Sequence, residues 1–356
     1  MKLKLLAFLI LTTGTIFSQK INKDQLDGYV NYIENNNGGI GSLSVYKNGK
    51  EVYNRSFGQS KLINVDFNKE TKYQIASVTK MITAMLILKL VEDGRLALDT
   101  KLSDFYPEIP NSDKITIKNL LEHTSGLGNF AIKNGVIWVI EKASEKEIFE
   151  EIKKQGVSFE PNEKVVYSNS AYIILRMIIE GKYKKYYNKV VEQEITKPLN
   201  LKNFASVKSN PVNVFKSYKF AKNWTEIKDI EYLNVIGVGD IASTTKDLNI
   251  IITGLFQYRI LKKETVEIMK PIIGKEDWGR GLALFEYCFQ VPANKIGYDG
   301  NGGPFSLMQL KVIQEVITLV VFVIFSMLFF KNETFRWNHA IGFCFLILAV
   351  YFIFKK

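Results

Sequence analysis

The sequence has few cysteines and histidines, the side chains from which zinc sites are usually built. Its 356 residues include two cysteines, Cys288 and Cys344, and two histidines, His123 and His339. The cysteines do not have the short spacing of a zinc site, and two histidines alone do not provide a histidine-based one. We therefore expect no metal, and nothing in the sequence indicates an organic cofactor.

Internal repeats and blocks of like charge are also absent. Basic residues outnumber acidic ones by 11, an excess that can favour nucleic acids or anionic membranes. The lysines are scattered, however, and no run of five or six basic residues occurs, which is typical of a solvated surface. With 47% hydrophobic and 23% charged residues, the composition is that of a folded globular protein, and we expect no nucleic-acid partner.

The N-terminus has the charge and hydropathy pattern of a signal peptide. Lys2 and Lys4 precede a short apolar core at residues 5–11, and small or polar residues follow up to Ser18. The core is too short to span a bilayer. We expect residues 1–18 to be a signal peptide and the mature chain to lie on the periplasmic or extracellular side. The alternative is an ordinary buried first helix.

Two apolar runs near the C-terminus indicate membrane attachment. Residues 337–354 approach the length of a transmembrane helix, with Trp337 and Tyr351 placed for the two interfaces. Residues 312–330 fit either a second transmembrane helix or the last β-strand of the preceding domain. Hydropathy favours two spans, whereas the C-terminal lysines favour one under the positive-inside rule. In either case we expect the chain to be anchored in the membrane.

The region between these ends, residues 21–311, has the pattern of a single α+β domain. Its predicted elements are an amphipathic helix (21–35), a hairpin (41–57), a buried helix (78–90), a helix-rich region (about 95–235) and two strand-like stretches (282–291 and 305–310). The hairpin is indicated by Asn48-Gly49, and the end of the buried helix by Asp93-Gly94. Strands at both ends predict an antiparallel sheet, with the helical region inserted across one face and a cleft between the two parts.

The first chemical signal is the tetrad Ser77-Val78-Thr79-Lys80. Ser77 precedes the long apolar helix, so it lies at or near a helix N-terminus, where free amides and the helix dipole favour developing negative charge. Residues i and i+3 share a helix face, so the amine of Lys80 can reach the Ser77 hydroxyl. A lysine buried there has reason to lose its proton, as a general base must. Taken alone, the tetrad also fits an N-cap serine followed by a surface lysine.

Two further chemical signals follow along the chain. The phenol of Tyr167, near an ammonium group, can pass protons between a nucleophile and a leaving group, and the amide of Asn169 can fix the lysine and a substrate carbonyl. Glycines around Gly300 let a ligand approach the backbone, so the N–H of Asn301 can pair with that of Ser77 as an oxyanion hole. Taken separately, each signal also fits an ordinary turn.

The order and spacing of these signals resemble the class C β-lactamase and penicillin-binding-protein family of serine hydrolases, which includes D-amino-acid peptidases and esterases. The resemblance runs from about residue 38 to residue 308. Its landmarks are YQIASVTK (73–80), LVEDGRLALDTKLSDFYP (90–107), ITIKNLLEHTSGL (115–127), FEPNEKVVYSNSAYIIL (159–175), GVGDIASTTKDL (237–248) and GYDGNGGPFSL (297–307).

The resemblance implies an α/β/α sandwich with an inserted helical region, and an acyl-enzyme mechanism. Ser77 would be the nucleophile, Lys80 its base and Tyr167 the proton shuttle. Asn169 would orient the substrate, and the amides of Ser77 and Asn301 would form the oxyanion hole. The complete set of candidate site residues is Ser77, Lys80, Tyr167, Asn169, Tyr298, Gly300 and Asn301.

Other polar residues in these landmarks have structural interpretations. His123 invites a Ser-His-Asp interpretation, but Ser77 already has Lys80 within reach. We interpret His123 as lining a turn behind the site, and Asp240 and Asp247 as loop and helix-cap residues.

Two departures from the family pattern bear on the function. Where the third motif usually carries Lys or His, this chain has Tyr298, which offers no fixed positive charge for a substrate carboxylate. The end of the domain also looks shortened, because apolar segments begin soon after Gly303. We expect an extracytoplasmic serine hydrolase acting on an ester, an amide or a small peptide, with D-amino-acid-containing and β-lactam-like substrates included. The alternative is a catalytically weak, membrane-tethered sensor of cell-wall fragments.

Overall fold

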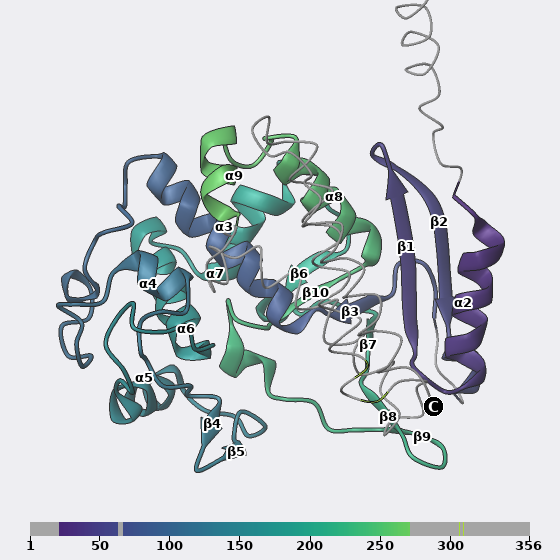
Figure 1. Cartoon of the computed structure of the whole chain (residues 1–356), viewed down its shortest axis with the longest axis horizontal. Helices are drawn as coiled ribbons and strands as arrows, with labels where there is room; N and C mark the ends of the chain where they lie inside the picture. The colour runs from purple at the N-terminus through teal and green to yellow at the C-terminus, as the bar shows by residue number, and fades with distance from the viewer. Residues whose placement is uncertain (1–20, 63–66, 271–305, 307–308, 310–356) are drawn as a thin grey trace, which may run out of the picture. The chain divides into compact units, whose positions relative to one another are not determined.

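A computed structural model of the chain describes residues 21–62 and 67–270, together with Ser306 and Gln309. The chain divides into two compact units, Met1–Met269 and Lys270–Lys356. The first unit contains four of the candidate site residues, Ser77, Lys80, Tyr167 and Asn169 (Figure 1).

The first unit alternates helices with mostly short strands. Its α-helices are α2 (Lys23–Asn35), α3 (Thr79–Glu92), α4 (Ile117–Leu121), α5 (Glu145–Gln155), α6 (Asn169–Tyr183), α7 (Tyr187–Val191), α8 (Thr245–Phe256) and α9 (Lys263–Met269). Its strands are β1 (Gly41–Lys47), β2 (Lys50–Phe57), β3 (Lys72–Gln74), β4 (Ile132–Lys133), β5 (Val136–Ile137), β6 (Phe204–Ser206), β7 (Val214–Phe215), β8 (Tyr218–Phe220), β9 (Trp224–Glu226) and β10 (Ile241–Ser243). Shorter 3-10 segments are η1 (Gln59–Lys61), η2 (Ala76–Val78), η3 (Leu102–Asp104), η5 (Val207–Ser209) and η6 (Tyr232–Val235), and η4 (Glu192–Thr196) is a π-helical turn.

A hairpin between two helices forms one side of the unit. Strands β1 and β2 pair antiparallel around Asn48 and Gly49, both of which have positive φ. Helix α2 packs against β2, and α8 packs against β1 (Figure 1). Asp27 of α2 accepts hydrogen bonds from Tyr53 Oη and Arg55 Nη1 of β2, at 2.7 and 3.1 Å. The hairpin is thus held between helices, in the three-layer order that the sequence led us to expect.

A second sheet lies under the start of α3. Its strand order is β6-β10-β3-β7, with β10 antiparallel to both β6 and β3. The β3–β7 pair is parallel, whereas the antiparallel sheet expected from strands at the two ends of the domain is represented among the described residues by the β1–β2 hairpin. Strand β7 has only two residues and adds to the edge of the sheet, where a few backbone hydrogen bonds suffice to hold it. Because β3 leads directly into η2 and α3, the sheet fixes the place where α3 begins.

Helix α3 is the central helix of the unit. Nearly all of its side chains are buried, including every position from Thr79 to Leu88. It packs against α6, which also contacts α4 and α7. A helix apolar on all sides has to be surrounded by other elements. The apolar run predicted as a buried helix at residues 78–90 therefore lies in the core of the unit, with the other helices packed around it.

Most of the local expectations are confirmed. Helix α2, the β1–β2 hairpin and α3 match the predicted elements at residues 21–35, 41–57 and 78–90, and α3 ends at Glu92, next to the Asp93-Gly94 end signal. The helix-rich region at about 95–235 contains α4 to α7 but also the strands β4 to β9. Strands of two or three residues are too short to produce an alternating hydrophobic pattern, so the sequence did not reveal them.

One predicted strand is wrong at its two described positions, Ser306 and Gln309. The N–H of Ser306 donates to Gln309 Oε1 at 2.9 Å, and the N–H of Gln309 donates to Ser306 Oγ at 3.2 Å. This reciprocal pattern is a capping box, and Gln309 is helical. The apolar residues of 305–310 suggested a strand, but the Ser-x-x-Gln spacing was a helix-start signal that outweighed them.

The other predicted segments lie outside the described residues. These are the signal peptide at 1–18, the strand-like stretch at 282–291 and the apolar segments at 312–330 and 337–354. Among the residues that the structure does describe, no helix is long and apolar enough to cross a membrane.

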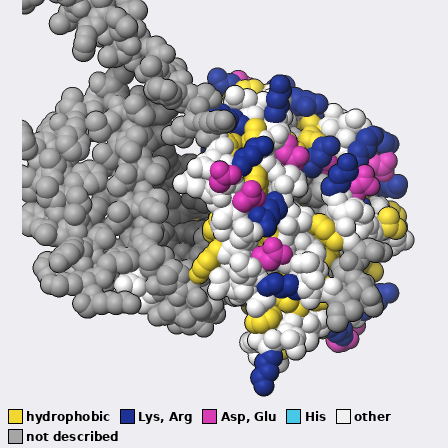
Figure 2. All heavy atoms as spheres, turned by 90° about the vertical axis from the view of Figure 1, so that its right-hand side faces the viewer, with side chains coloured by type: hydrophobic (Ala, Val, Ile, Leu, Met, Phe, Trp, Pro, Cys, Tyr) yellow, Lys and Arg dark blue, Asp and Glu magenta, His cyan; other side chains and the backbone are white. Residues whose placement is uncertain are grey.

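Charges of both signs are mixed on the described surface. Figure 2 shows lysine and arginine side chains interspersed with aspartate and glutamate on the coloured part of one face. The described residues also include exposed ion pairs, such as Lys216 with Glu226 and Lys114 with Glu160. Such pairs contribute little to stability because solvent screens them.

Candidate active site

Ser77 lies where a short 3-10 turn leads into helix α3. The turn η2 spans Ala76–Val78, and α3 begins at Thr79. The preceding Ala76 has a φ of 45°, in the left-handed region that residues other than glycine rarely adopt, so this turn is strained. Ser77 itself is partly exposed, at the positive end of the helix dipole. A nucleophile placed here is accessible to a substrate and close to groups that stabilise negative charge.

Three of the predicted site residues meet at this turn. Ser77 Oγ lies 2.8 Å from Tyr167 Oη and 3.3 Å from Lys80 Nζ. Ser77 and Lys80 are three residues apart at one helix start, whereas Tyr167 comes from the segment that precedes α6, 90 residues later. The structure thus brings the amine of Lys80 and the phenol of Tyr167 within hydrogen-bond reach of the Ser77 hydroxyl.

Lys80 is completely buried, in contrast to the lysines on the protein surface. None of its surface is exposed, and its Nζ donates a hydrogen bond to the backbone carbonyl of Val238 at 3.0 Å. Its Nζ also lies over the rings of Tyr167 and Tyr172, 4.9 and 5.8 Å from their centroids. Val238 was not among the residues chosen from the sequence, because a backbone acceptor leaves no side-chain signal.

His123 packs against the ring of Tyr167 and forms hydrogen bonds with the backbone next to it. Its Nδ1 accepts the backbone N–H of Ser168 at 3.2 Å, and its carbonyl accepts the N–H of Val166 at 3.0 Å. The imidazole ring packs between the rings of Tyr167 and Tyr172, with centroids 4.7 and 5.0 Å away. His123 therefore fixes the backbone on both sides of Tyr167, in keeping with the structural role that the sequence suggested.

The electrostatics of His123 argue against a role as a general base. Burial, with a smaller contribution from the charge of Lys80, lowers the pKa of His123 from 6.5 to about 3. Its imidazole is therefore neutral at physiological pH. One of its ring nitrogens already accepts a backbone hydrogen bond, so it serves the fold near Tyr167 rather than the proton of Ser77.

Asn169 begins helix α6, two residues after Tyr167. Its Nδ2 donates to Oδ1 of Asn129 at 3.0 Å, and both residues are partly exposed. The next residue along from Asn129, Phe130, donates its backbone N–H to Ser170 Oγ at 2.9 Å. The substrate-orienting role of Asn169 stays a prediction. Sequence reasoning missed Asn129, and its position shortly after the HTSGL landmark was the available signal.

The predicted loop role of Asp240 is confirmed, whereas the cap of helix α8 is Thr244, whose Oγ1 accepts the N–H of Asp247 at 3.2 Å. Asp247 Oδ2 accepts the backbone N–H groups of Lys202 and Asn203 at 3.0 and 2.5 Å. Asp240 accepts the N–H of Gly237 at 2.7 Å and the hydroxyl of Ser206. Burial raises the pKa of Asp240 to about 6, although these hydrogen bonds oppose the shift.

The remaining site predictions, Tyr298, Gly300 and Asn301, lie outside the described residues, so the oxyanion partner of Ser77 stays a prediction. Within the described part of the chain, no group of three or more His, Cys, Asp or Glu side chains is placed to hold a metal ion.

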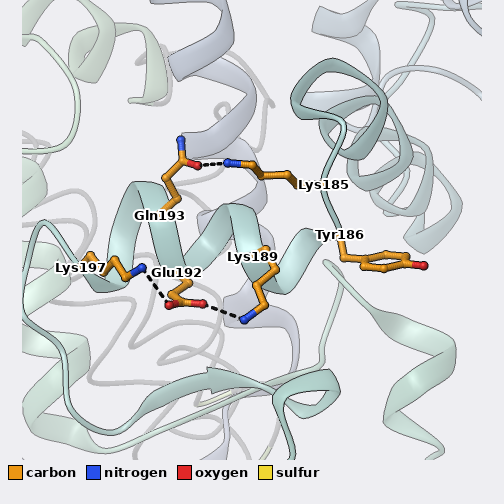
Figure 3. A pocket seen from close by; sticks show the side chains of 6 residues that line it. All are labelled: Lys185, Tyr186, Lys189, Glu192, Gln193 and Lys197. Atoms are coloured by element: carbon orange, nitrogen blue, oxygen red, sulfur yellow. Dashed lines mark hydrogen bonds and ion pairs between the residues drawn. The ribbon is translucent and has the colours of Figure 1, made fainter.

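A separate surface pocket is lined by residues of α7 and η4, by two residues just before α7 and by Lys197 just after η4 (Figure 3). Glu192 pairs with both Lys189 and Lys197, at 3.1 and 3.0 Å, and Lys185 donates to Gln193. The lysines of this pocket already have partners within it. The pocket contains none of the residues around Ser77, so we do not assign it to the candidate active site.

With this geometry established, comparison with known proteins identifies the family. The family model described as Beta-lactamase matches residues 34–308 of the chain. The chain belongs to the β-lactamase family. Its fold is accordingly the β-lactamase and penicillin-binding-protein type of α+β fold, and the resemblance based on the sequence landmarks is confirmed.

Individual relatives show how far this similarity extends. The chain is 27% identical over 246 residues to a Bacillus subtilis (strain 168) protein named "Putative penicillin-binding protein PbpX", covering 68% of this chain and 61% of the relative. It is 25% identical over 275 residues to the teichoic acid D-alanine hydrolase of Staphylococcus aureus, covering 74% and 65%. The chain thus spans less than two thirds of the length of either relative.

Among solved structures, the fold is similar to that of the D-amino acid amidase from Ochrobactrum anthropi SV3 in complex with L-phenylalanine. The TM-score is 0.60 at 25% identity, and the match covers 69% of this chain and 74% of the amidase. Two of these three proteins, the Staphylococcus aureus hydrolase and the Ochrobactrum anthropi amidase, have names that refer to D-amino acids.

Proposed function

We propose that the chain is an extracytoplasmic serine hydrolase that cleaves an ester, amide or small-peptide bond through an acyl-enzyme intermediate at Ser77. One observation carries the proposal: Ser77 Oγ is within hydrogen-bond reach of both Tyr167 Oη and Lys80 Nζ, at 2.8 and 3.3 Å. A serine that only capped a helix would not need a buried amine and a phenol directed at its hydroxyl.

The first step would use Lys80 as the general base. Its amine has no exposed surface and lies 3.3 Å from the Ser77 hydroxyl, so in its neutral form it could accept the hydroxyl proton directly. Lys80 would take the hydroxyl proton of Ser77 while the Ser77 oxygen forms a bond to the substrate carbonyl carbon. The negative charge that develops on the carbonyl oxygen would lie at the N-terminal end of α3, where the dipole and the Ser77 amide stabilise it.

The second step would use Tyr167 to deliver a proton to the leaving group. As the tetrahedral species collapses, the bond from the carbonyl carbon to the leaving oxygen or nitrogen breaks, and the leaving group takes a proton from Tyr167. Tyr167 would recover this proton from the protonated amine of Lys80, whose Nζ lies 4.9 Å from the Tyr167 ring centroid, and Lys80 would then be neutral again. Water would then release the acyl group from Ser77 by the same steps in reverse.

The substrate class is proposed from the relatives together with the sequence. Two relatives are named for D-amino acid chemistry, the D-amino acid amidase and the teichoic acid D-alanine hydrolase. Tyr298 provides no fixed positive charge for a substrate carboxylate. We therefore favour esters or amides of D-amino acids over carboxylate-bearing β-lactams. Export and membrane anchoring are part of the proposal and rest on the patterns at residues 1–18, 312–330 and 337–354.

The test is intact-mass labelling of the full-length chain, purified in detergent, with a fluorophosphonate probe. We expect one adduct on the wild type and none on Ser77→Ala. A panel of D-alanyl esters, D-amino acid amides and penicillins, assayed in parallel, would define the bond that is cleaved. If a folded wild-type chain takes up no probe and cleaves none of these compounds, the hydrolase proposal fails and the membrane-tethered sensor becomes the better interpretation.

A further inference from the structure

A short backbone segment, residues 237–241, lies against the start of α3 and contacts it at three points. Lys80 Nζ donates to the carbonyl of Val238 at 3.0 Å, and Thr83 Oγ1 donates to the carbonyl of Gly237 at 2.5 Å. At the residue before Lys80, Thr79 Oγ1 accepts the N–H of Ile241 at 3.3 Å. The segment thus follows the helix face that carries Lys80, and its carbonyls determine where the lysine amine is held.

The Asp240 side chain closes this segment into a fixed turn. Asp240 is completely buried, and its Oδ1 accepts the N–H of Gly237 at 2.7 Å, three residues earlier in the chain. Its Oδ2 accepts the hydroxyl of Ser206 on β6, and its backbone carbonyl accepts the N–H of Val207 at 3.0 Å. The carboxylate therefore joins the turn that presents the Val238 carbonyl to the sheet beneath it.

We propose that Asp240 is a positioning residue for the hydrolase reaction, which holds the Val238 carbonyl under Lys80 and so directs the lysine amine at Ser77. Asp240 would act only through this backbone, without touching the substrate. This inference rests on the proposed function, because it assigns a role in activating the nucleophile.

The physical reason lies in the geometry of a neutral amine. Such an amine has two N–H groups and one lone pair, and only the lone pair can accept the proton of Ser77. A hydrogen bond from Lys80 to Val238 fixes one N–H and thereby limits the directions available to the lone pair. If residues 237–239 lost the bond to Asp240, the acceptor carbonyl would move and Lys80 would spend less time aimed at Ser77.

Burying a carboxylate for this purpose is costly, and its surroundings show how the charge is accommodated. Ser206 and the backbone of Gly237 form hydrogen bonds with Asp240. Two titratable groups, Arg176 of α6 and Tyr187 of α7, also interact with it electrostatically. The Arg176 guanidinium lowers the pKa of Asp240 slightly, but burial dominates and leaves it at about 6. A residue that served packing alone would be better replaced by an apolar side chain of similar size.

The experiment measures fluorophosphonate labelling of the full-length chain at several probe concentrations, which separates the maximal rate constant of labelling from the half-saturating probe concentration. Asp240→Ala removes both side-chain acceptors, and we expect the maximal rate constant to fall about 10- to 100-fold at unchanged half-saturation. Asp240→Asn keeps an acceptor oxygen for the Gly237 N–H, and we expect it to recover to within about threefold of the wild type.

The matched control is Asp247→Ala. Asp247 is also a buried aspartate that accepts two backbone N–H groups, but it has no contact with residues 237–241 in the hydrogen-bond network described above. We expect it to lower the unfolding midpoint to a similar extent while changing the maximal labelling rate constant less than twofold. A general loss of stability would instead affect both aspartate variants equally.

A further variant keeps the inference testable if Asp240→Ala does not fold. Thr83→Val removes the hydroxyl that holds the Gly237 carbonyl at nearly constant volume, and we expect a three- to tenfold lower maximal labelling rate constant. If Asp240→Ala folds and is labelled at the wild-type rate, the positioning role is overturned but the proposed hydrolase function is not. If Asp240→Ala does not fold, a wild-type labelling rate in Thr83→Val has the same meaning. A wild-type chain that takes up no probe would refute the proposed function instead.

Discussion

At the scale of single residues, burial distinguishes Lys80 from the other lysines. Lys89 lies on the same helix but keeps a quarter of its side chain exposed and pairs with Asp93, whereas Lys80 has no exposed surface and reaches Ser77. Water stabilises the protonated form of an amine, and burial removes this stabilisation. Burial therefore makes Lys80, rather than Lys89, the lysine of this helix that suits the proposed role of a base.

The corresponding prediction compares Lys80→Met with Lys89→Met. Loss of the general base should reduce the labelling rate of Ser77 by about 10² to 10⁴ in Lys80→Met. Lys89→Met should stay within about twofold of the wild type, because Lys89 lies about three helical turns beyond the Ser77 hydroxyl. Stopped-flow or quenched-flow labelling measures both, and equal rates in the two variants would contradict the assignment of Lys80.

At the scale of elements, the site depends on how two loops pack together. The segment that carries Tyr167 follows Phe159, whose backbone lies directly against Gly126 in the loop that begins at His123. Backbone hydrogen bonds from Ser158 to Gly126 and from Asn162 to Thr124 join the two loops along their length. This contact positions the phenol relative to α3, which neither loop could achieve alone.

The test at this scale is Gly126→Ala. Gly126 has a φ of 78°, and an added Cβ would collide with the carbonyl oxygen of Phe159, so we expect the free energy of unfolding to fall by about 3 kcal/mol or more. The control is Gly181→Ala in α6, where nothing lies within 4 Å of an added Cβ and where alanine should raise stability by up to about 1 kcal/mol. Urea denaturation gives both values, and a tolerated Gly126→Ala would show that the two loops can separate.

At the scale of the whole molecule, folding places two buried titratable groups whose effects on stability oppose each other. His123 has a folded pKa of about 3 against 6.5, so between these values the unfolded chain binds more protons and stability falls as the pH falls. Asp240 has a folded pKa of about 6 against 3.8, so between these values the folded chain binds more protons and stability falls as the pH rises. Between about pH 4 and 6 the two contributions largely cancel.

This cancellation can be tested by removing each group in turn. Relative to the wild type, the unfolding free energy of Asp240→Asn should rise by about 2 to 3 kcal/mol as the pH increases from 4 to 6, because only the His123 contribution remains. His123→Asn, which tolerates the positive φ at this position, should show the opposite trend of similar size. Urea denaturation at pH 4, 5 and 6 measures the differences, and parallel curves for all three proteins would contradict the two pKa shifts.

The sequence by itself determined the local features of this protein. The i,i+3 spacing of Ser77 and Lys80 at the start of an apolar helix, the turn at Asn48-Gly49 and the order of the family landmarks all follow from short-range pattern, and the structure and the family match agree with them. These features could be read because helix periodicity and turn chemistry act over a few residues. The Ser306–Gln309 capping box shows that even a short-range signal can be overlooked beside an apolar run.

The tertiary structure alone decided which distant groups meet around Ser77. The Val238 carbonyl under Lys80, the Asp240 turn behind it and the His123 ring behind Tyr167 come from segments up to 158 residues apart, and no local pattern encodes their contact. Two of these contacts involve backbone atoms, which every residue type shares and which the sequence therefore does not mark. Long-range packing of α3 against α6 and the sheet places them together, because burying the same apolar surfaces fixes all three segments at once.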